Sequence, residues 1–330
     1  MFYISSQGHS ASGWLSRALS MHPKIVCWHG TRSIPPYDSG ENDISGKNFV
    51  EGLLQCEKGC QNGKIFGACH GYYGPQLKKT VEENNGTFLW IVRNPIKRVN
   101  SIFLAFAPRL LTYGLLPADT KNIDIYGLVK NHEQLINNKF NNYINDIQKN
   151  NNGINRIINY PNRINLVRGI KDRIKLISNN SSIRKKRMKY YNNNSDIDID
   201  SIENIPDSEI AKKMIETFNK ACKRTFFTDY DLHNACGMDG VIKMEKMTTS
   251  KEYYYDAVLS KIISKTVDNS YLDEVFNQKD HINVHDPKNK KENVIFNSWP
   301  ESFQNHFINA WDKRRLDSLY SALEYEKPSL

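Results

Sequence analysis

The sequence contains no apolar run approaching about 18 residues, so no membrane-spanning helix is expected. It also contains no CxxC pair, and its six cysteines are scattered along the chain. Cys56 and Cys60 have a CxxxC spacing that matches no zinc site, whereas Cys27 and Cys69 lie in apolar segments typical of reduced core cysteines. The start of the chain lacks the basic segment of a secretory signal. A cytoplasmic location is therefore the expectation.

Acidic residues are fewer than basic ones, at 36 Asp and Glu against 45 Lys and Arg, which gives a formal charge of +9. This excess suits an anionic ligand, but it is too modest to indicate a nucleic-acid partner. At 330 residues the chain can bury a large core, as one large α/β domain or as two smaller ones.

Residues 1–14 read MFYISSQGHSASGW and combine an apolar strand with a turn of small and polar residues. Trp14, Leu15, Ala18 and Leu19 follow at helical spacing, which predicts an amphipathic helix directly after the turn. The free N–H groups and the positive end of a helix attract anions, and small side chains let a phosphate approach closely. The segment therefore predicts an anion-binding loop after the first strand.

Apolar runs alternate with helical stretches through the first 125 residues. Strands are expected at 2–4, 24–28, 64–69 and 87–92, helices at 48–56 and 75–84, and a further helix that begins at Pro95. Such alternation is typical of a parallel sheet that is covered by helices on both faces. The predicted fold class is α/β, a three-layer fold with a central, mostly parallel sheet flanked by helices, in a single domain over residues 1–330.

Asn-rich strings with intervening Lys, Ile and Asp occupy residues 136–206. This composition indicates either an insertion or mobile segment within the domain, or a general compositional bias that also affects ordered helices. The run RKKRMK at 184–189 is typical of a solvated face, and a contact surface for an acidic acceptor is the alternative. Beyond this region, helices are expected at 210–222, 254–262 and 303–323, and a strand at 240–244.

A second motif, RNPIKRVNS, starts at Arg93 and ends at Ser101. Arg93 closes a predicted strand, and ligands of parallel sheets bind at the carboxyl ends of the strands. A guanidinium presents a planar fork to phosphate oxygens and a hydroxyl adds a donor, so these two residues could grip one anionic group together. The alternative is that Arg93 caps a neighbouring loop and Ser101 is an exposed helix residue.

Other nucleotide-binding motifs are missing from the sequence. No Lys-Ser or Lys-Thr follows a glycine within residues 5–14, so the GxxxxGK[ST] motif of P-loop kinases is absent, with its lysine and its magnesium-bound hydroxyl. No GxGxxG follows the first strand, which argues against a dehydrogenase.

The two motifs together resemble those of the sulfotransferases that use 3′-phosphoadenosine-5′-phosphosulfate (PAPS). In that family, a strand–loop–helix with a pattern like Lys/Arg-Ser-Gly-Thr-Thr/Ser-Trp/Leu holds the 5′-phosphosulfate, and a later Arg-x-Pro-x-x-x-x-x-Ser holds the 3′-phosphate. This chain has the second pattern with full spacing. In place of the first pattern it reads His9-Ser10-Ala11-Ser12-Gly13-Trp14. The resemblance covers residues 1–105, returns faintly at 240–262 and 298–328, and implies a P-loop-type fold.

The resemblance implies a role for each matched residue. The 5′-phosphosulfate would be held by the side chains of Ser10 and Ser12 and by the backbone of Ala11, Ser12, Gly13 and Trp14. The 3′-phosphate would be held by Arg93 and Ser101. Trp14 would also stack on the adenine, and packing into the core is the alternative for this ring. No metal ion is required, because the loop and basic side chains can neutralise the donor.

The chain departs from the family at His9, where many relatives have Lys or Arg. That cation stabilises charge on the bridging oxygen as the sulfuryl group leaves. A histidine is only partly protonated at pH 7 unless a phosphate raises its pKa, and we hypothesise that bound nucleotide makes His9 a cation or a proton donor. Alternatively, the side chain is reoriented and Arg32 or a lysine elsewhere supplies the charge.

Transfer to an alcohol also requires a base for the acceptor proton, and a histidine suits neutral pH. His70 follows the strand at 64–69, where relatives that act on small molecules place a catalytic histidine, and it is the leading candidate. His29 is the competitor, and either residue could instead orient substrate or cap a loop. The expected activity is sulfuryl transfer to a hydroxyl or amine of a saccharide or small molecule. The alternatives are a non-catalytic nucleotide-binding relative and a P-loop kinase-like phosphotransferase.

Overall fold

The computed structural model describes residues 1–6, 10–29, 46–60, 63–71, 76–103, 207–263, 269–277 and 291–329. The expected Asn-rich segment at 136–206 lies outside these ranges, as do His9 and Arg32. The chain divides into two compact units. Unit 1 comprises Met1–Arg98, Arg224–Lys290 and Ala310–Ser329, and unit 2 comprises Val99–Lys223, Lys291–Asn309 and Leu330.

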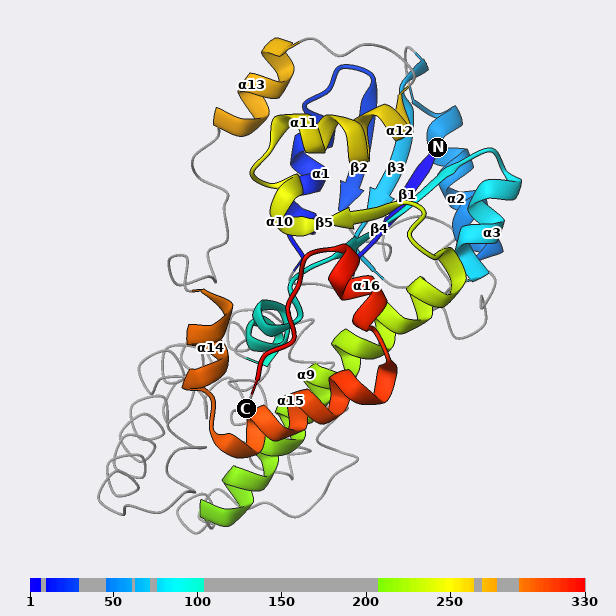
Figure 1. Cartoon of the computed structure of the whole chain (residues 1–330). Coiled ribbons are helices and arrows are strands. Elements are labelled where there is room, and N and C mark those ends of the chain that lie inside the picture. Colours follow the sequence, from blue (N-terminus) through cyan, green and yellow to red (C-terminus); the bar gives the residue numbers. More distant parts are fainter. Residues whose placement is uncertain are drawn as a thin grey trace, which may run out of the picture. The chain divides into compact units, whose positions relative to one another are not determined.

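Unit 1 is built on a five-stranded parallel sheet (Figure 1). Its strands are β1 (Phe2–Ser5), β2 (Ile25–His29), β3 (Ile65–Cys69), β4 (Thr87–Val92) and β5 (Val241–Lys243). Their order is β2-β3-β1-β4-β5, and every adjacent pair is parallel. The short, mostly apolar runs are typical of strands that are buried on both faces. The prediction of an α/β fold with a parallel central sheet is therefore confirmed.

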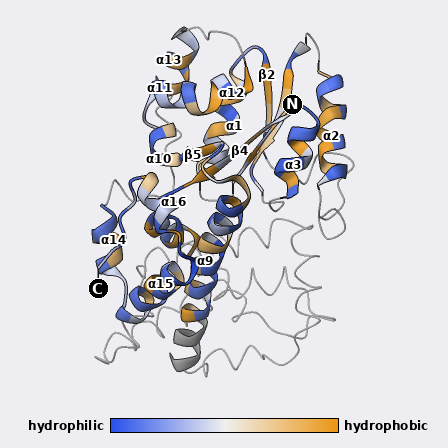
Figure 2. Ribbon diagram, turned by 45° about the vertical axis from the view of Figure 1, so that its right-hand side comes forward, coloured by the Kyte–Doolittle hydropathy of each residue, from blue (hydrophilic) through white to orange (hydrophobic). Residues whose placement is uncertain are grey.

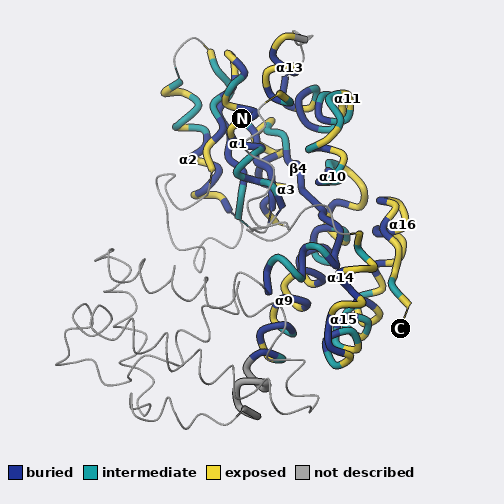
Figure 3. The backbone as a smooth tube through the Cα atoms, turned by 90° about the vertical axis from the view of Figure 1, so that its left-hand side faces the viewer, coloured by how far each residue is buried: buried dark blue, intermediate teal, exposed yellow. Residues whose placement is uncertain are grey.

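Helices cover both faces of this sheet. α1 (Ser12–Ser20) packs on the face where Phe2 and Ile4 of β1 join the core. α2 (Lys47–Lys58) packs on the opposite face, where the rings of Tyr3 and Phe49 meet edge to face at 5.3 Å, and α3 (Gln76–Glu83) lies beside α2. In Figure 2 the strands are largely hydrophobic, whereas α2 carries both hydrophobic and hydrophilic residues. In Figure 3 the tube of β4 has the dark blue of buried residues. Alternation along β1 thus supplies apolar residues to two cores.

Gly67 allows β1 and β3 to pack closely. It pairs in register with Phe2, and a Cβ at Gly67 would lie 2.5 Å from three atoms of the Phe2 ring. Because that ring is fully buried and has no room to move, we expect Gly67→Ala to lower the free energy of unfolding by about 1–3 kcal/mol. Urea denaturation measures the change. The control is Gly59→Ala, whose Cβ would come no closer than 3.5 Å to another atom; an equal loss in both variants would contradict the packing.

The remaining helices of unit 1 follow in two later stretches of chain. α9 (Asp207–Cys236) belongs to unit 1 from Arg224 onward and leads through Gly240, with φ 65°, into β5. After β5 come α10 (Met244–Met247), α11 (Lys251–Tyr254), the π-helical η3 (Tyr255–Leu259), α12 (Ser260–Ile262), α13 (Asn269–Asn277) and, near the end of the chain, α16 (Asp317–Ala322). A hydrogen bond links α13 to α1, since the Tyr271 hydroxyl donates to the Ala18 carbonyl at 2.7 Å.

A fully buried ion pair joins the helix that begins at residue 95 to α9. Arg98 Nη1 lies 2.7 Å from Asp229 Oδ1, and neither side chain is more than 1% exposed. The Tyr320 hydroxyl donates to Asp229 Oδ2 at 2.9 Å. Burial raises the pKa of Asp229, while Arg98 and Tyr320 act in the opposite direction. The carboxylate is thus held by two partners from distant parts of the sequence.

The described part of unit 2 consists mainly of helices that pack around a cluster of aromatic side chains. It contains residues 99–103, the first part of α9, α14 (Glu292–Ser298) and the first part of α15 (Glu301–Arg314). The Phe218 ring stacks on Phe303 at 4.2 Å and meets Phe103 and Trp299 edge to face. This cluster buries large apolar rings from three segments of the sequence.

The helical prediction at 303–323 is confirmed for most of its length, but the structure divides the segment into two helices, α15 and α16. The break lies at Arg315 and Leu316. Arg315 has φ 51°, in the left-handed region, which ends α15. Both helices contribute buried residues, so the apolar periodicity of the sequence continues across the break. The periodicity therefore did not indicate where α15 ends. The other predicted helices and strands in the described ranges are present, with ends shifted, and 210–222 is part of the longer α9.

Candidate active site

The predicted site residues that the structure describes in unit 1 gather at one edge of the parallel sheet. Ser5 of β1 pairs in register with Trp90 of β4, so the loop after β1 and Arg93 after β4 start from the same edge. His29 ends β2 and His70 follows β3, its neighbour in the sheet. This edge is formed by the carboxyl ends of the strands, where parallel sheets bind ligands.

The chain remains tied to the neighbouring strand for one residue beyond β1. Ser6 N–H donates to the Gly71 carbonyl at 3.3 Å, and Gly71 N–H donates back to the Ser6 carbonyl at 2.9 Å. The Ser6 hydroxyl is buried and has no hydrogen-bond partner in the part of the chain described. Residues 7–9, which include His9, lie outside the described ranges. A buried hydroxyl thus lies at the entry of the predicted anion-binding loop.

The start of α1 leaves backbone donors available. Ala11 is the N-cap residue, in a left-handed conformation with φ 55°, and no side chain caps the helix. The first helical bond runs from Leu15 N–H to the Ala11 carbonyl at 3.0 Å, so the N–H groups of residues 12–14 have no acceptor within the helix. The first turn of the helix contains no acidic residue. This helix end can therefore accept an anion. Ser10, just before it, is buried.

The two histidines predicted as alternative bases meet at one hydroxyl. Ser12 Oγ lies 3.0 Å from His70 Nδ1 and 3.2 Å from His29 Nε2. The two imidazole rings stack, with 4.8 Å between their centroids and 23° between their planes. Gly13 lies beside them, since a Cβ at this position would be 3.9 Å from His29 Nε2. The first turn of α1 and the ends of β2 and β3 therefore form one polar cluster.

Both imidazoles of this cluster favour the neutral form. Burial lowers the pKa of His70, and the charges of His29 and Arg224 lower it further. Burial also lowers the pKa of His29, with a further contribution from Arg17. Arg224 and Arg17 were not singled out in the sequence, because they lie on α9 and α1 with no local motif that connects them to a histidine. A neutral imidazole can accept a proton at pH 7.

These pKa directions predict a loss of stability on acidification. The pKa values of His22, His29 and His70 lie below 6.5 in the folded protein, whereas in the unfolded chain they return to that value. The unfolded state therefore binds more protons in this window, and the free energy of unfolding should rise with pH through it and level off above about pH 6.5. Urea denaturation between about pH 5 and pH 7.5 measures the slope. His70→Asn should make the slope shallower; a slope of opposite sign would contradict the neutral histidines.

Arg93 occupies the expected position after β4, and its side chain is only 3% exposed. The helix that runs from residue 95 to 103 begins directly after it, with Pro95 at its first position as predicted. Asn94 caps this helix, since its Oδ1 accepts from Lys97 N–H at 3.2 Å. Ser101 belongs to unit 2, so a joint grip with Arg93 stays a prediction.

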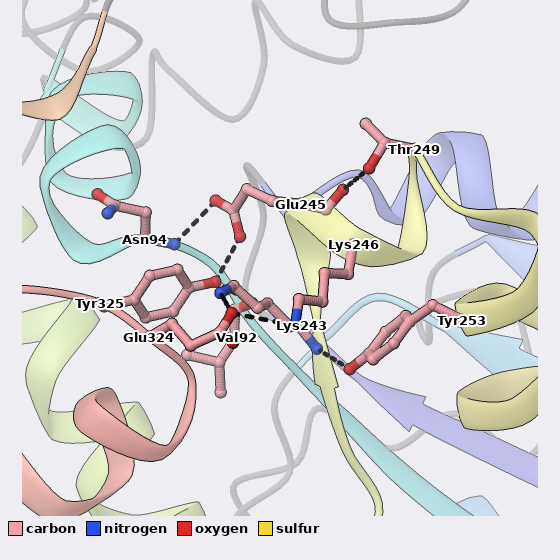
Figure 4. Close-up of polar contacts among 9 residues, drawn as sticks. All are labelled: Val92, Asn94, Lys243, Glu245, Lys246, Thr249, Tyr253, Glu324 and Tyr325. Carbon is pink, nitrogen blue, oxygen red and sulfur yellow. Dashed lines mark hydrogen bonds and ion pairs between the residues drawn. The ribbon is translucent and has the colours of Figure 1, made fainter.

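A polar network that was not predicted joins the ends of β4 and β5 to the C-terminal segment (Figure 4). Glu245 Oε1 accepts from Asn94 N–H at 3.0 Å, and Glu245 Oε2 accepts from the Tyr325 hydroxyl. Lys243 and Lys246 lie 2.8 and 3.0 Å from Glu324 Oε2 and lower the pKa of Glu324 to about 2. The sequence offered one signal for this network: Lys243 is the last residue of β5, and Glu245 follows two residues later. The network fixes the backbone next to Arg93.

Trp14 packs within unit 1. Its ring is partly buried and meets the rings of Tyr254 and Phe276 edge to face at 5.6 and 5.7 Å. These contacts support the core-packing alternative for this residue, and stacking on adenine stays a prediction.

Two absences concern the described part of the chain. None of its helices is long and apolar enough to cross a membrane. It holds no group of three or more His, Cys, Asp or Glu side chains placed to bind a metal ion.

Comparison of the sequence and the structure with protein-family models, curated proteins and solved structures finds no match. The site is therefore interpreted from its own geometry.

Proposed function

We propose that this chain is a sulfotransferase that transfers a sulfuryl group from PAPS to a hydroxyl or amine of an acceptor. The observation that supports the proposal is the shared sheet edge: parallel pairing of β1 and β4 brings the end of β1, where the small-residue loop begins, and the end of β4, next to Arg93, to the same edge of the sheet. A donor with anionic groups at both ends suits two positive sites of this kind.

The loop after β1 suits the sulfonate and phosphate end of the donor. Three features favour an anion there: the backbone donors at the start of α1 that have no acceptor within the helix, the absence of an acid in its first turn, and the buried hydroxyl of Ser6. Ser12 adds a second hydroxyl. Backbone dipoles and hydroxyls that are already oriented stabilise developing charge without reorganisation during the reaction.

The neighbouring imidazoles suit the proton transfer. In the reaction, the acceptor oxygen bonds to sulfur as the bond between sulfur and the leaving phosphate oxygen breaks, and the acceptor proton passes to a histidine. His70 and His29 lie beside the start of α1, and the directions of their pKa values keep them neutral before the reaction. General base catalysis of this kind contributes about 10²–10⁴-fold in rate.

A transfer assay tests the proposal. The purified chain is incubated with ³⁵S-labelled PAPS and a panel of saccharides and small alcohols, and labelled products are separated from PAPS and from free sulfate. Transfer of label to at least one acceptor class, with release of 3′,5′-adenosine bisphosphate (PAP), is the expected result. Binding of PAP without transfer or hydrolysis would instead support the non-catalytic nucleotide-binding alternative. Failure to bind either nucleotide would overturn the assignment.

A further inference from the structure

Ser12 bridges the two candidate bases in a way that couples their protons. A hydroxyl has one proton to donate, and each neutral imidazole has one N–H and one bare nitrogen. Ser12 Oγ contacts Nδ1 of His70 and Nε2 of His29, and a hydroxyl oxygen can accept from both rings at once or donate to one and accept from the other. A proton passes between the rings through Oγ only when one ring donates and the other accepts.

Two neutral arrangements let Ser12 Oγ accept from one ring and donate to the other. In the first, His70 Nδ1–H donates to Ser12 Oγ, whose proton points to His29 Nε2, so both rings carry their proton on Nδ1. In the second, both rings carry it on Nε2. Interconversion shifts one proton along each bond, removes one proton from one outer nitrogen and adds one to the other (His70 Nε2 and His29 Nδ1), and moves no heavy atom. In these two arrangements the histidines share one tautomer, whereas donation by both rings to Oγ gives opposite tautomers and no relay.

We propose that His70, Ser12 and His29 form a proton relay in which His70 takes the acceptor proton and His29 delivers a proton to solvent. This inference rests on the proposed function for the identity of the acceptor. His70 Nε2 is the bare nitrogen of the first arrangement and is the base. His29 is the more exposed of the two rings, which places the exit of the relay at its Nδ1.

The relay balances as follows. The acceptor O–H bond breaks and a bond forms between that proton and His70 Nε2. The proton on His70 Nδ1 passes to Ser12 Oγ as the proton of Oγ passes to His29 Nε2, and His29 Nδ1–H then releases its proton to water. After product release, exchange of both outer nitrogens with water restores the first arrangement. No other reactant is needed.

The charged groups around the relay favour release of the proton. Arg17 of α1 acts on His29, and Arg224 of α9 acts on His70, so neither ring holds a positive charge well. The thiol of Cys69, on β3, donates to the Ser12 carbonyl at 3.2 Å and leaves the Ser12 hydroxyl available to the rings. The geometry thus assigns to Ser12 a positioning and relay role in addition to anion binding.

The ¹⁵N NMR spectrum of the histidine rings tests this inference without nucleotide or acceptor. The full chain is labelled on its nine histidines, and ring signals are assigned from His→Gln variants at pH 7.5. The expected result is the same tautomer for His29 and His70, with the proton on Nδ1. His22 is the internal reference, because its Nδ1 accepts from Lys24 N–H at 3.2 Å and its proton must lie on Nε2. Opposite tautomers for His29 and His70 would overturn the relay.

Two variants separate a relay from a merely structural contact. Ser12→Ala removes the bridge, so the His29 and His70 tautomers should become independent, and the two-step titration of the coupled rings should become a single step for each. His29→Gln preserves a polar contact to Ser12 but has no nitrogen that takes up and releases a proton at neutral pH, so kcat should fall about tenfold with KM unchanged. An unchanged kcat in His29→Gln would exclude His29 from the relay. If no sulfuryl transfer is found but His29 and His70 share one tautomer, the proposed function is wrong, whereas the proton coupling of the two histidines through Ser12 is supported.

Discussion

Replacement of His70 by asparagine should lower kcat about 10²–10⁴-fold and leave the affinity for PAP almost unchanged. His70 lies at the end of β3, 3.0 Å from Ser12 Oγ, and its neutral imidazole can accept a proton. Asparagine is the appropriate substitution because His70 has φ 81°, and Asn adopts a positive φ more readily than Ala. A lower kcat with unchanged PAP affinity would therefore indicate that the variant has lost its general base.

Steady-state transfer kinetics and PAP calorimetry measure the two effects of His70→Asn. His233→Asn is the matched control, since His233 lies near the end of α9 and contacts the carbonyl of Gly237 rather than the site. That control should retain full activity. Turnover equal to wild type in His70→Asn would show that His70 is not the base and would transfer the role to His29. Because the two histidines act through one hydroxyl, the double variant should lose less than the product of the single losses.

Replacement of Asp229 by alanine should lower the free energy of unfolding by about 3–5 kcal/mol. The change leaves the Arg98 guanidinium buried without its counter-ion, and Arg98 Nε and Nη2 already have no hydrogen-bond partner in the described residues. It also removes the acceptor of the Tyr320 hydroxyl. An unpaired buried charge is far more costly than an absent ion pair.

A double variant distinguishes the cost of the unpaired charge from the loss of packing. Arg98→Met combined with Asp229→Leu removes both charges and preserves apolar volume, so it should be more stable than either Asp229→Ala or Arg98→Met alone. Tyr320→Phe should cost only about 1 kcal/mol, because it removes one hydrogen bond. Urea denaturation at pH 7 measures all four variants. A loss below about 1 kcal/mol for Asp229→Ala would contradict a buried ion pair at this position.

The sequence was sufficient to predict the parallel sheet. The runs at β1, β3 and β4 are short, apolar and separated by helical stretches, and that alternation permits few arrangements other than a parallel sheet. Pro95 marked the start of the helix after β4 because proline suits the first helical position. The sequence pattern did not determine the strand order, which places β1 between β3 and β4.

The contacts within the site required the three-dimensional structure. His29 and His70 are distant in sequence, and no local pattern indicated that both would contact Ser12. Arg224 acts on His70 from α9, which is distant in the sequence, and nothing in its own segment connects it with the site. The buried pair of Arg98 and Asp229 was likewise invisible, since a charged residue in a helical pattern is usually solvent-exposed.

Calorimetric titration with PAP tests the central claim most directly: that the ends of β1 and β4 bind one nucleotide. Wild type should show saturable binding at one site, and Arg93→Gln should weaken it at least about tenfold, because a charge-assisted hydrogen bond contributes about 1.5–3 kcal/mol. Lys79→Gln, which removes a charge from an 81% exposed side chain on α3, should bind as wild type does. Absence of PAP binding, or equal affinity in folded Arg93→Gln and wild type, would contradict the account.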